Sequence, residues 1–441
     1  MLNSFAPMLK KTTPAVVAVY TANVVRVVRQ TGPLSRQEEL LRRFFGMPSP
    51  RRQDSEQQVE ERRVPQGVGS GVIVSDDGYI LTNNHVVSDE RGNDADEVLV
   101  QLSDGEEYPA IIVGRDPNTD IAVLKIEGEN LPVAPIANSE NLEVGDVVFA
   151  IGTPLGVGLT VTQGIISATG RAIGIYGDEG YEDFIQTDAS INMGNSGGAL
   201  VDTEGRLIGI NSAILSQSGG NIGIGFAIPT NLATGIARQL VMYGEVRRGY
   251  LGVSTSDLSA EMAEAFDLDT TDGALVNEVE EESPAALGGI QRGDVVITID
   301  GRPVKDSYGL RLLVGQLLPD STVKVEFYRD GELKSTEVIL ADRDATLGTG
   351  AELFTGVMVG TLNEENREEY RIPDTVEGLL ITEVEASSGY SRYLRPGMVF
   401  LEINDRPVPT IAEGRESLRR GVNKLYVYDR GQAGYLALRL R

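Results

Sequence analysis

The sequence predicts a mainly β protein of several domains. At 441 residues the chain is longer than one compact domain and corresponds to roughly two to four. From residue 67 to about 228, short runs rich in valine and isoleucine alternate with turn signals, a pattern typical of β-barrels or a β-sandwich. After residue 248 the sequence pattern changes, and two similar modules follow one another.

One extended segment and one long polar segment precede the strand-rich region. Residues 13–28 (TPAVVAVYTANVVRVV) are rich in valine, which predicts a strand. Residues 30–66 are charged and carry four prolines, which predicts a long loop. Within the strand-rich region, the Asp-Gly pairs at 77–78 and 104–105 predict tight hairpins.

A helix and an internal repeat complete the chain. Residues 229–243 carry a helical pattern, with Pro229 near the first turn and Gly244 directly after the last residue. The segment RGDVVITIDGRPV at 292–304 is echoed by RPGMVFLEINDRPV at 395–408. Because further strand-like segments match ahead of each copy, the repeat predicts two modules of the same fold.

Composition excludes several classes of function. The net charge of −26 repels nucleic-acid phosphates, so DNA or RNA binding is not expected. The absence of cysteine excludes thiol catalysis, disulfides and cysteine-ligated metals. His85 is the single histidine, so a two-histidine zinc site is excluded and any imidazole base must be this residue. No apolar run is long enough for a transmembrane segment, and the first residues lack the apolar core of a secretory signal.

Three residues supply the chemical groups of a serine protease. His85 in LTNNHVV, Asp120 in NTDIAVLKI and Ser196 in GNSGG follow the chain order of chymotrypsin-fold proteases. The imidazole can take the serine proton, and the carboxylate can orient the imidazole. The turn formed by Gly194, Asn195 and Ser196 is the expected oxyanion hole. Taken singly, each residue also has a structural interpretation, as a turn serine, a turn aspartate or a loop-capping histidine.

The serine motif has one competing interpretation. GNSGG also matches the nucleophile elbow of α/β-hydrolases. In that fold a histidine follows the serine in the chain, and here no histidine follows Ser196. The chymotrypsin-like order is therefore the one that fits.

Four segments together resemble the HtrA family of serine proteases: GSGVIVSDDGYILTNNHVV, DPNTDIAVLKI, GNSGGAL and NIGIGFAIP. Within that family the chain looks most like the periplasmic DegQ/DegP group, and DegQ especially. The resemblance implies a trypsin-like double β-barrel protease domain at 1–247, with its long loop at about 30–66, followed by PDZ domains at 248–343 and 352–441. It also implies an ATP-independent endopeptidase that degrades misfolded or unfolded proteins, with chaperone activity beside it.

Partners, location and cofactors follow from the same resemblance. The expected partners are unfolded polypeptides and further copies of this chain, as trimers or multiples of trimers (hexamers, 12-mers or 24-mers). The expected location is the periplasm, and the expected role is envelope protein quality control. Neither a metal nor an organic cofactor is implied.

The resemblance also points to residues that recognise substrate. No acidic residue stands six positions before Ser196, where the pocket floor of a trypsin-like fold lies, so a preference for arginine or lysine is not expected. We expect small aliphatic residues before the cut, in a pocket formed by Ser190, Ile191, Ile214 and Leu215. In the first PDZ domain the expected peptide-binding residues are Tyr250, Leu251, Gly252 and Val253.

A second class of function stays open. A holdase-type chaperone or PDZ scaffold with a resting protease domain would use the barrels and PDZ domains only for binding. The intact set of His85, Asp120 and Ser196 favours the protease, because a pure binder needs none of the three.

The sequence also predicts a pH dependence. The imidazole of His85 must be neutral to act as the base, so activity should fall at pH values below its pKa, near 6.5 if unperturbed.

Overall fold

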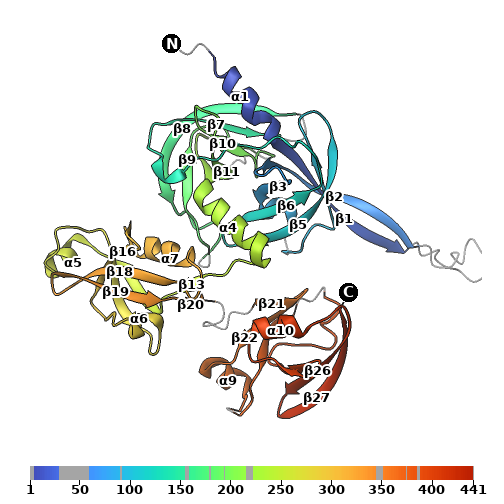
Figure 1. The fold of residues 1–441 in the computed structure, drawn as a ribbon, viewed down its shortest axis with the longest axis vertical. Coiled ribbons are helices and arrows are strands. Elements are labelled where there is room, and N and C mark those ends of the chain that lie inside the picture. The colour runs from blue at the N-terminus through green and yellow to red at the C-terminus, as the bar shows by residue number, and fades with distance from the viewer. Residues whose placement is uncertain are drawn as a thin grey trace, which may run out of the picture. The chain divides into compact units, whose positions relative to one another are not determined.

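The chain folds into two compact units, Met1–Val246 and Arg247–Arg441. Both consist mainly of strands, as the sequence predicts (Figure 1). Among the described residues, no helix has the length and apolar character needed to cross a membrane. The computed structural model describes residues 4–28, 59–89, 92–153, 158–177, 180–192, 194–214, 222–343, 351–373, 375–384 and 388–440.

The first unit contains two closed antiparallel barrels, which settles the choice left open between barrels and a sandwich. The strand order is β1-β2-β3-β6-β5-β4 in the first barrel and β10-β11-β12-β9-β8-β7 in the second. The first barrel is formed by β1 (Val16–Val28), β2 (Val59–Ile73), β3 (Tyr79–Asn83), β4 (Glu97–Gln101), β5 (Glu107–Asp116) and β6 (Ile121–Ile126). The second is formed by β7 (Val147–Gly152), β8 (Thr160–Arg171), β9 (Phe184–Thr187), β10 (Ala199–Val201), β11 (Leu207–Ile214) and β12 (Gly225–Pro229).

Local backbone chemistry sets the hairpins of the first barrel. Gly78 and Gly105 have φ of 96° and 93°, which a glycine adopts without a steric penalty. They close the turns between β2 and β3 and between β4 and β5, and both pairs of strands are antiparallel. The hairpins predicted from the two Asp-Gly pairs are therefore confirmed.

The expected loop at 30–66 is too long at its C-terminal end. Strand β2 begins at Val59, and residues 59–66 pair with the second half of β1, where the polar composition had predicted a loop. Pro65 is accommodated because it lies opposite Ala22 at a register shift, where a missing N–H does not interrupt the ladder. Residues 29–58 of that predicted loop lie outside the described residues.

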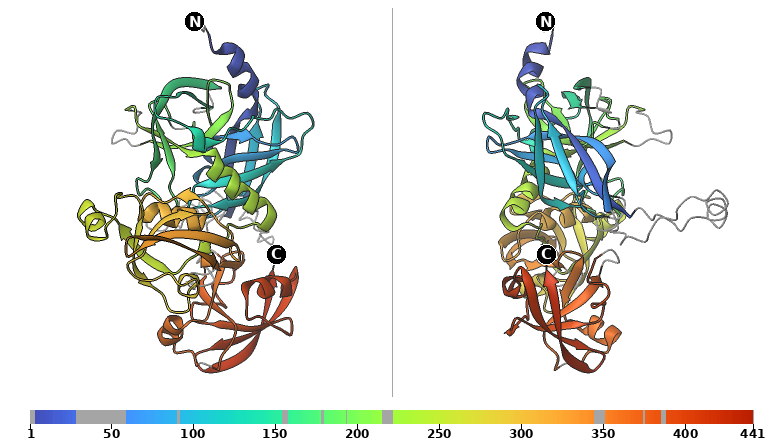
Figure 2. Two further views of the ribbon diagram at one scale, coloured as in Figure 1. Left: turned by 60° about the vertical axis from the view of Figure 1, so that its left-hand side comes forward. Right: turned by 90° about the vertical axis from the view of Figure 1, so that its right-hand side faces the viewer.

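Helices cover the barrels at their ends. The predicted helix is confirmed as α4, which begins after Pro229 and ends at Gly244 in the left-handed conformation with φ of 76°. It packs against β5 and β6 of the first barrel and β11 and β12 of the second. Figure 2 shows the N-terminal helix α1 at one end of the barrels, where the ring of Phe5 lies 4.8 Å from that of Phe149. Among the described residues, the helices of this unit are α1 (Ala6–Thr12), η1 (Thr13–Ala15), α3 (Asn84–Val87), η2 (Ser139–Asn141) and α4 (Thr230–Tyr243).

The second unit contains two modules that share one strand order, with β21 as an additional edge strand in the second, which confirms the internal repeat. The first has the strand order β14-β15-β16-β18-β19 and the second β21-β22-β23-β24-β26-β27, and each has a short hairpin strand on its central strand. Even the registers agree, because Ile299 pairs with Arg302 and Ile403 pairs with Arg406. A separate two-stranded ladder joins β13 and β20.

The elements of the two modules are as follows. The first module contains β13 (Gly249–Tyr250), β14 (Val253–Asp257), α5 (Ala260–Ala265), β15 (Ala274–Val279), α6 (Pro284–Leu287), β16 (Val295–Ile299), β17 (Arg302–Pro303), α7 (Ser307–Gly315), β18 (Thr322–Arg329), β19 (Glu332–Ile339) and β20 (Ala341–Asp342). The second contains β21 (Ala351–Phe354), β22 (Val357–Thr361), α9 (Glu364–Tyr370), β23 (Leu379–Val384), β24 (Val399–Ile403), β25 (Arg406–Pro407), α10 (Ile411–Ser417), β26 (Gly421–Asp429) and β27 (Gln432–Leu440).

Candidate active site

The three predicted triad residues come from both barrels of the first unit. His85 lies in α3 after β3, and Asp120 lies directly before β6, so both belong to the first barrel. Ser196 precedes β10 of the second barrel. A short chain of hydrogen bonds connects them through Ser212 of β11, whose carbonyl accepts from Ser196 Oγ at 3.2 Å and whose hydroxyl donates to Asp120 at 2.9 Å.

The carboxylate of Asp120 is buried and holds the imidazole of His85. Its side chain lies 2.8 Å from His85 Nδ1 through Oδ2, and Oδ1 accepts the backbone N–H of the same histidine at 3.0 Å. The backbone carbonyl of Asp120 accepts from Asn83 Nδ2 and from the N–H of Asn84. Because the carboxylate can only accept, Nδ1 must donate the hydrogen bond and therefore carries the proton. Nε2 is then left as the basic nitrogen.

The pKa of His85 lies above its usual value of 6.5. Burial opposes a charge on the ring and lowers the pKa. The hydrogen bond and the negative charge of Asp120 outweigh that effect, because both stabilise the imidazolium. The side chain remains half exposed, so a substrate can reach it.

We expect kcat/KM to fall with decreasing pH, with a midpoint above pH 6.5. The neutral imidazole is the active form, so a raised pKa shifts the loss of activity to higher pH, and each further unit below the midpoint costs about tenfold. The measurement is kcat/KM on a fluorogenic peptide from pH 5 to 9, with enzyme returned from each pH to pH 8 as a control for inactivation. A midpoint below 6.5, or a flat profile, would contradict the assignment.

The turn that carries Ser196 is fixed by the first barrel. The N–H of Ser70 donates to the Ser196 carbonyl at 2.8 Å, and Ser70 Oγ donates to the Gly194 carbonyl at 2.7 Å. Gly197 has a φ of 80°, and a Cβ there would lie 2.1 Å from the carbonyl oxygen of Ser70. The glycine after the serine is therefore required both by the backbone conformation and by this close approach.

Two of the three expected oxyanion-hole residues offer an available N–H. The N–H of Asn195 donates to the carbonyl of Asn192 at 3.0 Å, so it is already engaged. Within the part of the chain that the structure describes, the N–H groups of Gly194 and Ser196 have no protein acceptor. An incoming carbonyl oxygen could therefore accept from these two donors.

The nucleophile and the base are not hydrogen-bonded to each other. Among the described residues, Ser196 Oγ donates to the carbonyl of Ser212 and has no bond to His85. Ser196 Oγ must leave this carbonyl to reach Nε2. Catalytic hydrogen bonds are often formed only when substrate is bound, so this geometry is compatible with His85 as the base.

Three further residues hold the predicted triad in place, and the sequence analysis does not predict them. Ser70 of the first barrel binds the nucleophile turn of the second, while Ser212 and Tyr176 of the second barrel bind Asp120 of the first. Each barrel thus orients a functional group that the other barrel carries. Only Ser212 left a signal in the sequence, as a polar residue within the apolar strand LIGINSAI.

The predicted pocket residues are only partly brought to this turn. The carbonyl of Ser190 accepts from Thr162 Oγ1 at 2.9 Å and from Asn195 Nδ2 at 3.4 Å, which places it beside the nucleophile turn. Ile191 is buried in the core of the second barrel. Ile214 is the last residue of β11, and Leu215 lies outside the described residues.

The four predicted peptide-binding residues lie together in the first module of the second unit. Tyr250 ends β13 and Val253 begins β14, the last strand in the order of its sheet. The carbonyls of Leu251 and Gly252 accept the N–H groups of Ala285 and Glu280. Among the described residues, the N–H groups of Leu251 and Gly252 have no protein acceptor.

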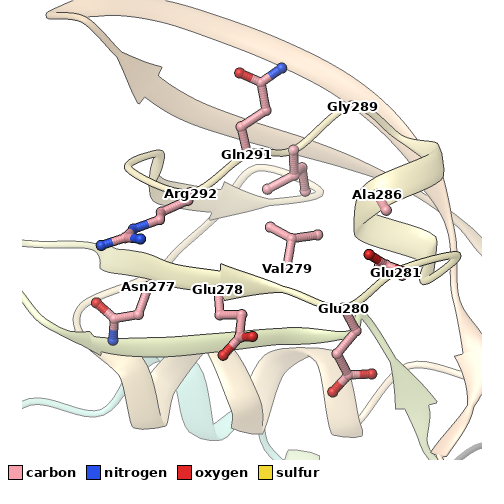
Figure 3. Close-up of a pocket in the computed structure, with 10 residues that line it drawn as sticks. Asn277, Glu278, Val279, Glu280, Glu281, Ala286, Gly289, Gln291 and Arg292 are labelled. Carbon is pink, nitrogen blue, oxygen red and sulfur yellow. The ribbon is translucent and has the colours of Figure 1, made fainter.

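A separate cavity of about 730 Å³ lies in the same module (Figure 3). Val279 of β15 points into it, whereas Glu278 and Glu280 point to the opposite side of the strand. None of the four predicted peptide-binding residues lines the cavity. The lining residues are Asn277, Glu278, Val279, Glu280, Glu281, Ala286, Gly289, Ile290, Gln291 and Arg292.

Comparisons with known proteins agree with this geometry. The family described as trypsin-like peptidase domain matches residues 69–210, and that described as PDZ domain matches residues 249–340. A probable periplasmic serine endoprotease DegP-like of Pseudomonas putida (strain GB-1) is 39% identical over 458 residues, which cover 100% of this chain and 93% of the relative. The solved structure of the HtrA-type protease AlgW with decapeptide is 42% identical, with a TM-score of 0.57, and covers 77% of this chain and 99% of that one. The chain belongs to the HtrA family.

Membership of the HtrA family makes the chain a serine endopeptidase. The expected fold, a trypsin-like double barrel followed by PDZ domains, is confirmed. A DegP-like relative from Chlamydia pneumoniae is 39% identical over 431 residues, which cover 95% of this chain and 86% of the relative. Both relatives are named DegP-like, so the closer likeness to DegQ stays a prediction.

Proposed function

We propose that this HtrA protease cleaves unfolded or misfolded polypeptides without ATP, using His85, Asp120 and Ser196 as its catalytic residues. The observation that carries the proposal is the pairing of the single histidine with a buried carboxylate at 2.8 Å, beside a serine whose turn is fixed by Ser70. The pairing leaves Nε2 as the base, and the turn leaves two N–H donors for an oxyanion.

The proposed chemistry proceeds in two steps. Ser196 Oγ attacks the scissile carbonyl carbon while its proton passes to His85 Nε2, and the oxyanion accepts hydrogen bonds from the N–H groups of Gly194 and Ser196. The C–N bond then breaks, and the imidazolium gives its proton to the leaving amine. A water molecule hydrolyses the acyl-enzyme by the reverse proton transfers. Asp120 stabilises the imidazolium throughout, and no nucleotide enters any step.

Substrate selection is proposed to follow the predicted pocket. Ser190 beside the nucleophile turn offers no negative charge to an arginine or lysine side chain. We therefore propose small aliphatic residues before the cut, in the pocket predicted from the sequence at Ser190, Ile191, Ile214 and Leu215. Discrimination by one methyl group is modest, about 1–3 kcal/mol.

The first PDZ domain is proposed to bind peptide termini through Tyr250, Leu251, Gly252 and Val253. Strand β14 ends its sheet, so an extended peptide can add to it as a further strand. The N–H groups of Leu251 and Gly252 are placed to hold a terminal carboxylate. The solved relative named above is described as a protease with decapeptide, so a member of this family binds a short peptide.

Replacing Gly252 with alanine should weaken binding of a peptide terminus at least about tenfold. Gly252 has a φ of 76°, and a Cβ there would lie 2.2 Å from Ser283 Cβ, so the loop must shift. Gly301→Ala is the matched control, because that glycine has a φ of 74° with open space around it. The measurement is fluorescence anisotropy with a labelled decapeptide that ends in apolar residues, compared with its C-terminal amide. Equal affinities for parent and Gly252→Ala would refute the assignment.

Assembly, location and domain limits are proposed on the family resemblance. The working form is a trimer or a multiple of trimers, and chaperone activity accompanies cleavage. The relatives' names place those proteins in the periplasm, and the same location is proposed for this chain. The proposed domains are the protease at 1–247 and PDZ domains at 248–343 and 352–441.

The substrate class is tested with one protein in two states. Native α-lactalbumin, with its disulfides intact, is compared with the reduced and carboxymethylated form, in buffer treated with apyrase to remove nucleotides. We expect the unfolded form to be degraded at least about tenfold faster, because a folded chain exposes extended backbone only in its rare open states. Equal rates, or a requirement for ATP, would overturn the proposal.

One observation favours a second candidate, a holdase-type chaperone or PDZ scaffold with a resting protease domain. In the described residues, Ser196 Oγ donates a hydrogen bond to the Ser212 carbonyl and none to His85. If the parent protein suppresses aggregation of reduced α-lactalbumin but releases no peptides, with or without an added peptide terminus, this second candidate replaces the first.

A further inference from the structure

The carboxylate of Asp120 has a hydrogen-bond partner, Tyr176, that a His-Asp-Ser triad does not require. Tyr176 Oη lies 3.2 Å from Asp120 Oδ2 and 2.8 Å from Ser212 Oγ, and Ser212 Oγ lies 2.9 Å from the same Oδ2. Three oxygens from three separate segments therefore meet beside the catalytic pair. Asp120 and Ser212 are both buried, so these bonds lie away from the surface.

The hydroxyl of Tyr176 adds one hydrogen-bond donor to this group of oxygens. Each hydroxyl has one proton, and the Ser212 proton is directed to Asp120. The Tyr176 proton goes either to Asp120 directly or to Ser212, which then becomes a stronger donor to Asp120. Burial and the charge of Asp120 raise the pKa of Tyr176 far above its usual value, so the phenol keeps its proton at any working pH.

The position of Tyr176 is set by its own loop, between β8 and β9. The nearly buried carboxylate of Glu182 accepts three backbone N–H groups, those of Ile173, Gly174 and Tyr176. The ring of Tyr176 also packs against Phe184, with 5.7 Å between the centroids. The hydroxyl is therefore delivered to Asp120 by a braced loop of the second barrel.

The titratable groups that face the pair in the described residues come from both barrels. Asp120 faces the imidazole, Tyr176 faces Asp120, and Glu182 lies behind Tyr176. Arg115 of β5 donates to the side chain of Asn84 and pairs with Asp94. Within the part of the chain that the structure describes, Tyr176 is the one titratable side chain besides His85 that is hydrogen-bonded to the Asp120 carboxylate.

We propose that Tyr176 is a positioning residue for proteolysis, which acts from the second barrel with Ser212 to orient the Asp120 carboxylate and to limit the charge that this carboxylate offers to His85. The inference rests on the proposed catalytic role of the triad. It differs from a role in packing alone, because a packing role would not change the protonation of His85.

The test is Tyr176→Phe, which keeps the ring on Phe184 and removes only the hydroxyl. We expect kcat to fall about 5- to 30-fold, with KM changed less than about twofold. The acid limb of kcat/KM should move up by about half a unit, since Asp120 with one donor fewer stabilises the imidazolium more strongly. Tyr108→Phe is the matched control, because its hydroxyl also donates to a carboxylate, that of Glu106, on the exposed surface of the first barrel.

A second readout does not depend on activity. Because the chain has one histidine, a ¹³C-histidine-labelled sample gives a single imidazole signal, which can be titrated by NMR in the Ser196→Ala background. The Tyr176→Phe change should raise that midpoint, and Glu182→Gln, which loosens the loop, should raise it less. If neither variant moves the midpoint, or if only KM changes, the proposal is wrong. If the parent shows no proteolysis but the midpoint moves, the positioning holds and the proposed function fails.

Discussion

Replacing Ser196 with alanine is expected to abolish degradation of reduced casein while the protein stays folded. Loss of a triad serine typically costs about 10⁴- to 10⁶-fold in turnover. The turn itself should persist, because it is held by backbone bonds: Ser70 donates to the Ser196 carbonyl, and Gly197 donates to the carbonyl of Asn211. Only the hydrogen bond from Ser196 Oγ to the Ser212 carbonyl is lost, which lowers the free energy of unfolding by about 1 kcal/mol.

Peptide release from casein, measured by fluorescence without ATP, checks this result. Ser103→Ala, in the exposed turn between β4 and β5, is the matched control and should retain full activity. Residual cleavage above about a thousandth of the parent rate by Ser196→Ala would show that another residue or a contaminating protease performs the reaction. Thermal melting of each variant confirms that the fold is kept.

Replacing Asp120 with asparagine should lower kcat by about 10⁴-fold at almost unchanged shape. In the parent protein, the Asp120 carboxylate accepts hydrogen bonds from His85 Nδ1 and from the Ser212 hydroxyl. An asparagine amide that offers its NH₂ to Nδ1 stabilises the wrong tautomer and places the proton on Nε2, where the base is needed. The acid limb should also move to lower pH, because Asp120 is what raises the pKa of His85.

The matched control is Asp116→Asn, since Asp116 is an equally buried aspartate four positions earlier. Its partner Thr119 can still donate to the remaining oxygen, so activity should stay within a few-fold of the parent. The shift of the acid limb is opposite in direction to that expected for Tyr176→Phe. A normal rate for Asp120→Asn would exclude the triad and leave Ser196 to be activated by some other group.

The elements that can be predicted from the sequence are those that residues close by in the chain determine. Helix α4 has Pro229 before it and Gly244 after it, and both choices follow from backbone preferences. The hairpins at Gly78 and Gly105 follow from the same kind of local signal. The repeat was recognisable because both modules keep the same strand and turn pattern.

The end of the long loop was predicted wrongly for a tertiary reason. Residues 59–66 are polar, which favours a loop when they are judged alone. In the structure they pair with the second half of β1, which supplies the backbone partners that a loop would lack. Pairing with a distant strand decided this segment, and composition did not.

The fold class, the repeat and the three proposed catalytic residues could all be predicted from sequence, since each follows from a local pattern or from chain order. The contacts that hold these residues form only on folding: Ser70 lies 124 positions from Gly194, and Tyr176 lies 56 positions from Asp120. A hydroxyl has no preferred partner until folding brings an acceptor within about 3 Å of it in a buried place. The closure of two barrels against each other supplies those distances, and no pattern of neighbouring residues records them.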